Sequence, residues 1–276
     1  MRGNALIGAI ILLAVVIAAF WLFAGAPGGV YYSATTSDTR VKAYPVLVYF
    51  PADGETRAFA VTLEVENLGA EDATYLVKTS EDGTSETLDV RAEGKEKMRV
   101  DMGDVSTDVA KYVYRWVKVF RNSEDALVTE VPVHIVIGTA PKAEAQTDSN
   151  RTVIGQKFVI ADHRSDSFVV YADVDDAAAV SEVNVSVPDS APITVTSVTY
   201  TEQTLNSNKW LKAVVNYRVR DSAIEDRLYT FDYNVGIAYE GNTVETATLP
   251  AVFVYGGPEE LADRYDSVFA EVENVG

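Results

Sequence analysis

The sequence predicts an all-β protein, with an N-terminal transmembrane helix followed by two tandem β-sandwich domains and a short C-terminal amphipathic helix. Residues 5–25 form an uncharged apolar run, and many segments between residues 30 and 256 alternate apolar with polar side chains. Val and Thr are abundant, and the chain contains 15 Tyr. Branched and aromatic side chains suit a pleated, half-buried surface, so this composition favours sheet.

Charge and cysteine content narrow the possible functions. The chain carries 41 acidic and 23 basic side chains, for a formal net charge of −18. We expect no nucleic-acid partner, because neutralising phosphates requires a basic surface. The chain contains no cysteine, which excludes thiol catalysis, structural zinc sites built from cysteine, and lipoprotein anchoring.

The apolar run over residues 5–25 predicts contact with the membrane. About 20 apolar residues, rising about 1.5 Å each, cross a hydrocarbon core of about 30 Å. Trp21 and Phe23 stand near one end of the run, where an aromatic belt is expected, and Arg2 precedes it. Because basic flanks stay in the cytoplasm, we predict a single-pass signal anchor over residues 1–29 with the C-terminal bulk extracytoplasmic.

Two kinds of processing compete with a retained anchor. Residues 24–26 have the small-x-small form of a secretory cleavage site, but Pro27 would follow the cut. The apolar run is also longer than a signal-peptide core of about 7–15 residues.

The second alternative is a filament. Met1-Arg2-Gly3, directly before the apolar run, resembles the short leader of archaeal type IV pilin-like proteins. The resemblance implies cleavage after Gly3 and assembly through the N-terminal helix. The chain departs from that pattern at Gly8, where many bacterial pilins carry Glu, and at the Pro-Gly-Gly break after the run.

Period-two alternation predicts a first sandwich over residues 30–138. Phe59, Val61, Leu63 and Val65 fall on one face of a strand over residues 57–68, with polar or small side chains on the other. Asp-Gly pairs at residues 53–54 and 82–83 are expected to close hairpins. Further strands are predicted over residues 41–50, 75–79, 87–92, 97–101, 109–121 and 127–137, with Pro132 in the last strand pointing to an edge position.

A second series of strands follows a predicted linker. Residues 139–151 lack apolar periodicity and are rich in small and polar side chains. The second sandwich, over residues 152–256, is predicted from strands at 152–160, 167–173, 182–187, 193–201, 210–220, 228–239 and 243–255, with a tight turn at 240–242. About seven short strands in about 100 residues indicate an Ig-like sandwich in each half.

One motif in the first half resembles a known module. Residues 60–69 read AVTLEVENLG, an alternating strand that ends in Asn-x-Gly, and a turn follows at residues 81–84. This resembles the CARDB-like Ig-like modules of archaeal and bacterial cell-surface proteins. The resemblance implies adhesion, spacing or assembly, and no chemistry.

The C-terminal segment 257–276 differs from the rest of the chain. Its apolar side chains recur at helical spacing, which predicts a short acidic amphipathic helix: Leu261, Tyr265, Val268, Phe269 and Val272 share one face. Two dockings are possible for this face, on the chain's own second domain or on a neighbouring subunit.

Few residues of the sequence point to catalysis. His134 lies on the strand face opposite Val133 and Ile135, so we expect it to be exposed or at an edge. His163 lies in a polar loop beside Ser165, but adjacency along a turn does not build a catalytic triad. We therefore predict that the chain is not an enzyme.

Acidic clusters give one weak metal candidate. Asp173, Asp175 and Asp176 offer carboxylate oxygens for Ca²⁺, against the alternative of a solvated acidic loop. Ca²⁺ is the only cofactor that the sequence suggests. A still weaker cluster comprises Asp101, Asp104 and Asp108.

Two sequons and an aromatic stripe remain. Asn150 and Asn184 open Asn-x-Ser/Thr triplets, which are candidate glycosylation sites outside the cell. The aromatic stripe comprises Tyr112, Tyr114, Trp116 and Phe120, spaced to share one strand face, which indicates either core or an exposed binding surface.

These observations predict a non-enzymatic, membrane-anchored extracellular scaffold or adhesion protein. Its partners would be the membrane, through residues 5–25, and other proteins or further copies of itself. A pilin-like filament subunit and an accessory or sensor subunit of a membrane complex are the alternatives.

Overall fold

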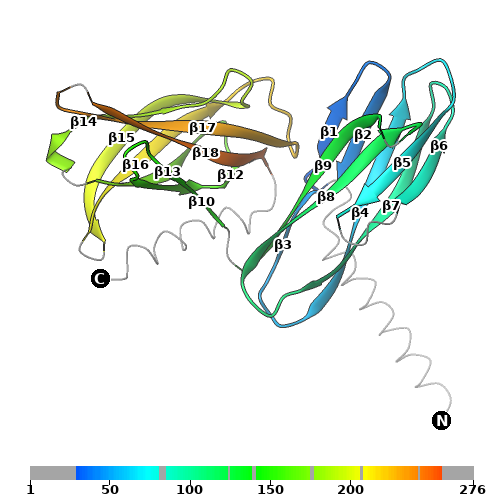
Figure 1. Cartoon of the computed structure of the whole chain (residues 1–276), viewed down its shortest axis with the longest axis horizontal. Coiled ribbons are helices and arrows are strands. Elements are labelled where there is room, and N and C mark those ends of the chain that lie inside the picture. The colour runs from blue at the N-terminus through cyan, green and yellow to red at the C-terminus, as the bar shows by residue number, and fades with distance from the viewer. Residues whose placement is uncertain are drawn as a thin grey trace, which may run out of the picture.

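A computed structural model describes residues 29–80, 85–123, 125–138, 141–174, 177–205, 208–241 and 243–256 (Figure 1). Within these ranges the chain forms β-strands and a single 3-10 turn, Ala177–Ala179. No helix in the described ranges has the length and apolar character needed to cross a bilayer. The predicted anchor, up to residue 28, and the predicted C-terminal helix over residues 257–276 lie outside the described residues.

The first sandwich packs a four-stranded sheet, in the order β1-β2-β4-β7, against a five-stranded sheet, in the order β3-β9-β8-β5-β6. Its strands are β1 (Tyr32–Thr35), β2 (Thr39–Tyr44), β3 (Leu47–Phe50), β4 (Thr56–Asn67), β5 (Ala73–Thr79), β6 (Ser85–Val90), β7 (Lys95–Ser106), β8 (Lys111–Arg121) and β9 (Leu127–Ile137).

The second sandwich packs the sheet β10-β11-β13-β16-β15 against the sheet β12-β18-β17-β14. Its strands are β10 (Lys142–Gln146), β11 (Thr152–Gln156), β12 (Phe158–Ala161), β13 (Ser165–Asp173), β14 (Val180–Ser186), β15 (Ile193–Leu205), β16 (Asn208–Val219), β17 (Leu228–Tyr239) and β18 (Val244–Tyr255).

Both sandwiches follow an Ig-like path. In each, an early strand changes sheets and its second half pairs in parallel with the last strand, β3 with β9 and β12 with β18. The second sandwich has the four-plus-three core of a constant-type Ig domain, with β10 added at the edge of one sheet and β12 at the edge of the other. In the first sandwich the corresponding fourth strand, β6, pairs with β5 instead.

Two predictions were wrong because the chain crosses from one sheet to the other: the single strand over residues 41–50 and the hairpin at residues 53–54. Residues 41–50 fall in two strands of opposite sheets, β2 and β3, with the cis peptide Tyr44-Pro45 between them. The Asp53-Gly54 turn likewise joins strands of opposite sheets, β3 and β4, and is not a hairpin turn. Residues 81–84 lie outside the described part, but β5 and β6 pair antiparallel on either side of them.

The predicted linker over residues 139–151 also contains structure. Lys142–Gln146 form β10, which pairs with β11. The side chain of Ala143 is buried in the second core. The sequence conceals this strand because its inward side chains are alanines, which carry a weak apolar signal.

The Asn-x-Gly motif at the end of β4 has a structural role. Asn67 is fully buried, and its side-chain amide donates to the carbonyl oxygens of Glu71 at 2.7 Å and Arg91 at 3.2 Å. Its Oδ1 accepts from the backbone N–H of Gly69 at 3.0 Å. One side chain therefore holds the turn after β4 and the end of β6 together.

Apolar packing continues from the first sandwich into the second. The first core includes Phe158, Leu228, Val252 and Val254, which belong to β12, β17 and β18. Two backbone hydrogen bonds of 2.8 Å also cross the junction, from Tyr31 N to Asp226 O and from Leu228 N to Tyr31 O. The two sandwiches therefore share a packed interface.

Candidate functional site

The aromatic stripe lies on the outer face of β8. Val117 and Val119 point into the first core, and the stripe residues point the other way. Tyr114 is 46% exposed. The stripe therefore lies on the outer face of the sheet, where Tyr114 is exposed and Tyr112 packs against Phe158 of the second sandwich with ring centres 5.8 Å apart. We call Tyr112, Tyr114, Trp116 and Phe120 the aromatic face.

An inward arginine holds β8 in this orientation. Arg115 is buried, and its guanidinium donates to the backbone carbonyl oxygens of Met102, of Gly103 at 3.4 Å and of Asp104 at 3.0 Å. These bonds satisfy part of a charged group that would otherwise be costly to bury. They tie β8 to β7 in the opposite sheet.

Lysines border the exposed part of the aromatic face. Lys118 Nζ lies 4.6 Å from the centre of the Trp116 ring, and Lys78 Nζ lies 5.7 Å from that of Phe120. Lys118 also forms an ion pair with Glu130 at 3.3 Å. The surface combines aromatic rings, which are enriched at protein interfaces, with ammonium groups near the rings.

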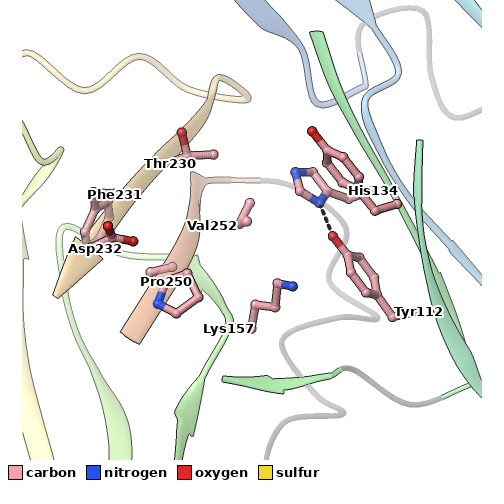
Figure 2. A pocket seen from close by; sticks show the side chains of 10 residues that line it. Tyr112, His134, Lys157, Thr230, Phe231, Asp232, Pro250 and Val252 are labelled. Carbon is pink, nitrogen blue, oxygen red and sulfur yellow. Dashed lines mark hydrogen bonds between the residues drawn. The ribbon is translucent and has the colours of Figure 1, made fainter. Parts of the chain in front are cut away.

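His134 links this face to the second sandwich (Figure 2). Its Nδ1 lies 2.8 Å from the Tyr112 hydroxyl, and its ring centre lies 5.6 Å from that of Phe158 in β12. The imidazole is only 4% exposed. The expectation of an exposed or edge histidine is therefore wrong, since the second sandwich covers the outward face of β9 at this point.

The position of Pro132 differs from that of His134. Strand β3 pairs with β9 only from His134 onward, so it does not reach Pro132. On its other side Pro132 faces Trp116 of β8. The predicted edge position is therefore confirmed at this point of the strand, where no N–H is needed.

Burial moves the pKa values of His134 and Tyr112 away from neutrality. Desolvation, with a smaller contribution from Lys157, lowers the pKa of His134 to about 4. Desolvation also lowers the pKa of Lys157 and raises that of Tyr112 above its ordinary value. A weakly basic imidazole beside a weakly acidic phenol is unsuited to general acid–base chemistry near neutral pH.

A shallow, open pocket of about 430 Å³ lies at this junction. Figure 2 shows Tyr112 and His134 on one side, Thr230, Phe231, Asp232, Pro250 and Val252 on the other, and Lys157 between them. Lys157 Nζ lies 4.3 Å from the centre of the Tyr112 ring. His134 Nε2 is buried and has no hydrogen-bond partner among the described residues.

The acidic metal candidates gain no support from the described residues. Asp173 is half-buried at the end of β13, and Asp175 and Asp176 lie outside the described part. Asp101, Asp104 and Asp108 are each exposed in or just after β7. In the portion of the chain that the structure describes, no three His, Asp or Glu residues are grouped to hold a metal ion.

The remaining candidates are separate surface positions. Asn150 lies in the exposed turn between β10 and β11, and Asn184 lies on the exposed side of β14. Both asparagines are therefore accessible to glycosylation. His163 is exposed in the turn before β13, where neighbouring Arg164 forms an ion pair with Asp221 at 2.9 Å.

Comparison with known proteins identifies no family. No protein-family model and no curated protein matches the sequence. Similar solved structures include the major pilin subunit BcpA of Bacillus cereus, at 7% identity and a TM-score of 0.27, covering 76% of this chain and 68% of the pilin. The E. coli chaperone DraB aligns at 10% identity and a TM-score of 0.28, covering 76% of this chain and 98% of the chaperone.

A Salmonella enterica SafA pilin–SafB chaperone structure aligns at 11% identity and a TM-score of 0.27, covering 80% of this chain and 98% of the matched chain. At TM-scores of this size, none of these similarities carries an argument about function.

Proposed function

We propose that the chain is a non-enzymatic, membrane-anchored scaffold or adhesion protein of the cell envelope. It makes protein–protein contacts through the aromatic face of its first sandwich. The observation that carries the proposal is the orientation of β8, which places valines inside and Tyr114, Trp116 and Phe120 outside. Aromatic side chains are enriched at protein interfaces and lose little conformational entropy on binding.

The packed junction between the sandwiches supports a scaffold role. Phe158 lies 5.8 Å from Tyr112, ring centre to ring centre, and five more buried apolar side chains of the second sandwich extend the first core, namely Ile160, Tyr171, Leu228, Val252 and Val254. A junction of this kind presents the aromatic face in a defined orientation relative to the second sandwich. The uncharged run over residues 5–25 supports the membrane anchor.

Cysteine labelling tests the contact surface, because the chain has no cysteine of its own. Thr87, exposed on β6 at the rim of the aromatic face, is replaced in Thr87→Cys. Thr199, exposed on the outer face of β15 in the second sandwich, provides the matched control Thr199→Cys. Each variant is labelled with a membrane-impermeant maleimide, on intact cells and as purified full chain in detergent.

If a partner covers the aromatic face, Thr87→Cys reacts several-fold more slowly on cells than in the purified chain, and Thr199→Cys does not. Adding Trp116→Ala restores the faster reaction, because the contact has lost its central ring. Equal cell-to-purified ratios for both cysteines contradict the proposal.

A filament subunit is the second candidate, favoured by Met1-Arg2-Gly3 before the apolar run. Mass spectrometry of the mature N-terminus separates the possibilities. A chain that begins at Met1 supports the retained anchor, and one that begins at Asn4 supports the filament. A chain that begins at Pro27 has been secreted and contradicts both. Stoichiometric co-purification with other membrane subunits would indicate the accessory-subunit alternative.

A further inference from the structure

Basic side chains gather on one sheet of this strongly acidic chain. The outer face of β2, β4 and β7 carries two charged rows in register, Arg40–Glu66–Lys95 and Lys42–Glu64–Lys97. A third row places Arg99 beside Thr62 and Tyr44. We call Arg40, Lys42, Lys95, Lys97 and Arg99 the basic face.

Within these three rows five cations outnumber two carboxylates, Glu64 and Glu66, and the next row adds the exposed carboxylate of Asp101 beside Ala60. Glu64 forms ion pairs with Lys95 and, at 3.1 Å, with Lys97, and its side chain is only 13% exposed. The side chains of Lys95 and Lys97 are 49% and 57% exposed. The carboxylate is therefore covered and the ammonium groups face the solvent.

Lys42 stands at the β2 end of the second row. Its Nζ lies 4.2 Å from the centre of the Tyr31 ring, and among the described residues it forms no ion pair with a carboxylate. Tyr31 thus extends the basic face to the edge of β1. Its flat ring provides apolar area beside the positive charge.

The described chain ends beside the same tyrosine. Tyr31 N donates to Asp226 O at 2.8 Å, and Asp226 N donates to Tyr255 O at 2.8 Å. Gly256 follows directly, with its Cα beside Asp226. The segment over residues 257–276 therefore starts next to one corner of the basic face.

The charge of that segment is opposite to that of the face. Residues 257–276 contain six acidic side chains and one basic side chain: Glu259, Glu260, Asp263, Asp266, Glu271 and Glu273, against Arg264. Because the segment is tethered, its effective concentration at a face beside its attachment point is high, on the order of millimolar for a short flexible link.

We propose that residues 257–276 bind the basic face of the first sandwich in the same chain. The binding screens the five cations of this face, four of them exposed and Lys42 half-buried, and covers the outer face of β2, β4 and β7. This inference concerns a different surface from the aromatic face and stands independently of the membrane anchor.

Disulfide trapping in the full chain, held in a non-ionic detergent, tests the contact. Thr62→Cys places a thiol among the basic side chains, and Ser267→Cys places one in the acidic segment. The matched control pairs Ser267→Cys with Thr199→Cys on the second sandwich. We expect an intramolecular disulfide to form at least tenfold faster in the Thr62 pair than in the control pair.

Raising the salt concentration and reversing charges test whether electrostatic attraction holds residues 257–276 on the basic face. Raising salt from about 0.01 M to about 1 M shortens the Debye length from about 30 Å to about 3 Å and should abolish the difference between the pairs. Lys97→Glu with Arg99→Glu should slow the Thr62 pair at low salt, and adding Glu259→Lys with Glu260→Lys should restore its rate. Unchanged melting temperatures show that the variants fold.

Three results would overturn the inference. They are equal rates for the two cysteine pairs, disulfides that join only separate chains, and a fast rate in the Thr62 pair that neither salt nor charge reversal alters.

Discussion

Asn67 joins chain segments that are distant in sequence through one buried amide. Its side chain makes bonds of 2.7, 3.0 and 3.2 Å to the backbone of Glu71, Gly69 and Arg91. Asn67→Ala removes all three bonds, although Arg91 O keeps the backbone N–H of Gly94 as a partner, and each lost hydrogen bond costs about 0.5–1.5 kcal/mol. We expect urea unfolding to show a loss of about 2–4 kcal/mol, whereas exposed Asn184→Ala should change stability by less than about 0.5 kcal/mol. Equal effects at the two sites would contradict this role.

His134 makes stability depend on pH. Its pKa is lowered from 6.5 to about 4 by burial, so the unfolded chain takes up a proton at a higher pH than the folded chain. The stabilisation from the buried neutral ring is full above pH 6.5 and is lost as the pH falls toward 4, by about 3 kcal/mol.

The titration of His134 can be isolated with His134→Gln, whose amide can donate to or accept from the Tyr112 hydroxyl but does not titrate. Between pH 6.5 and 4, unfolding free energies should fall more steeply for the wild-type chain than for this variant. Parallel curves would show that His134 does not contribute.

Strands β11 and β17 of the second sandwich approach each other closely at Gly155. A Cβ added to Gly155 in β11 would overlap the hydroxyl of Tyr233 in β17, and Tyr233 is fully buried. We expect Gly155→Ala to destabilise the chain by about 1–3 kcal/mol, the usual cost of overpacking.

Removing the hydroxyl relieves that overlap. Tyr233→Phe combined with Gly155→Ala should therefore be less destabilised than the sum of the two single variants, as measured in a double-mutant cycle of denaturant unfolding. Additive effects would mean that the hydroxyl is not the obstacle.

Strand positions follow from local pattern, but sheet membership does not. The alternation over residues 57–68 predicts β4 to within one residue at each end, and residues 127–137 coincide with β9. Residues 41–50 were predicted as one strand but divide into β2 and β3, and residues 152–160 likewise divide into β11 and β12. The alternation does not show these breaks, because the chain is β-strand on both sides of each break and only its partner strand changes. Such a change depends on the opposite sheet, which periodicity does not report.

The aromatic face and His134 show the same limit for the candidate site. Period two correctly groups the stripe residues on one face of β8, but it does not say which face is inside. The buried side carries Arg115 beside the valines, which a hydrophobicity pattern alone would place outside. His134 falls on the predicted outward face and is nevertheless covered, because Phe158 comes from the other sandwich.

Across the whole molecule, the packed junction joins the two sandwiches, and the first sandwich carries two distinct surfaces. The aromatic face lies on the five-stranded sheet of the first sandwich, and the basic face lies on its four-stranded sheet. Opposite faces of one sandwich are thus available for different contacts. The proposed function places both sandwiches outside the cytoplasm, whereas the contact proposed for residues 257–276 does not depend on location.

The most direct measurement of that placement is the labelling of Thr199→Cys by a membrane-impermeant maleimide in intact cells that express the full chain. The account predicts full reaction without lysis, with the labelled chain recovered in the membrane fraction. Reaction that requires lysis would place the sandwiches in the cytoplasm and contradict the account.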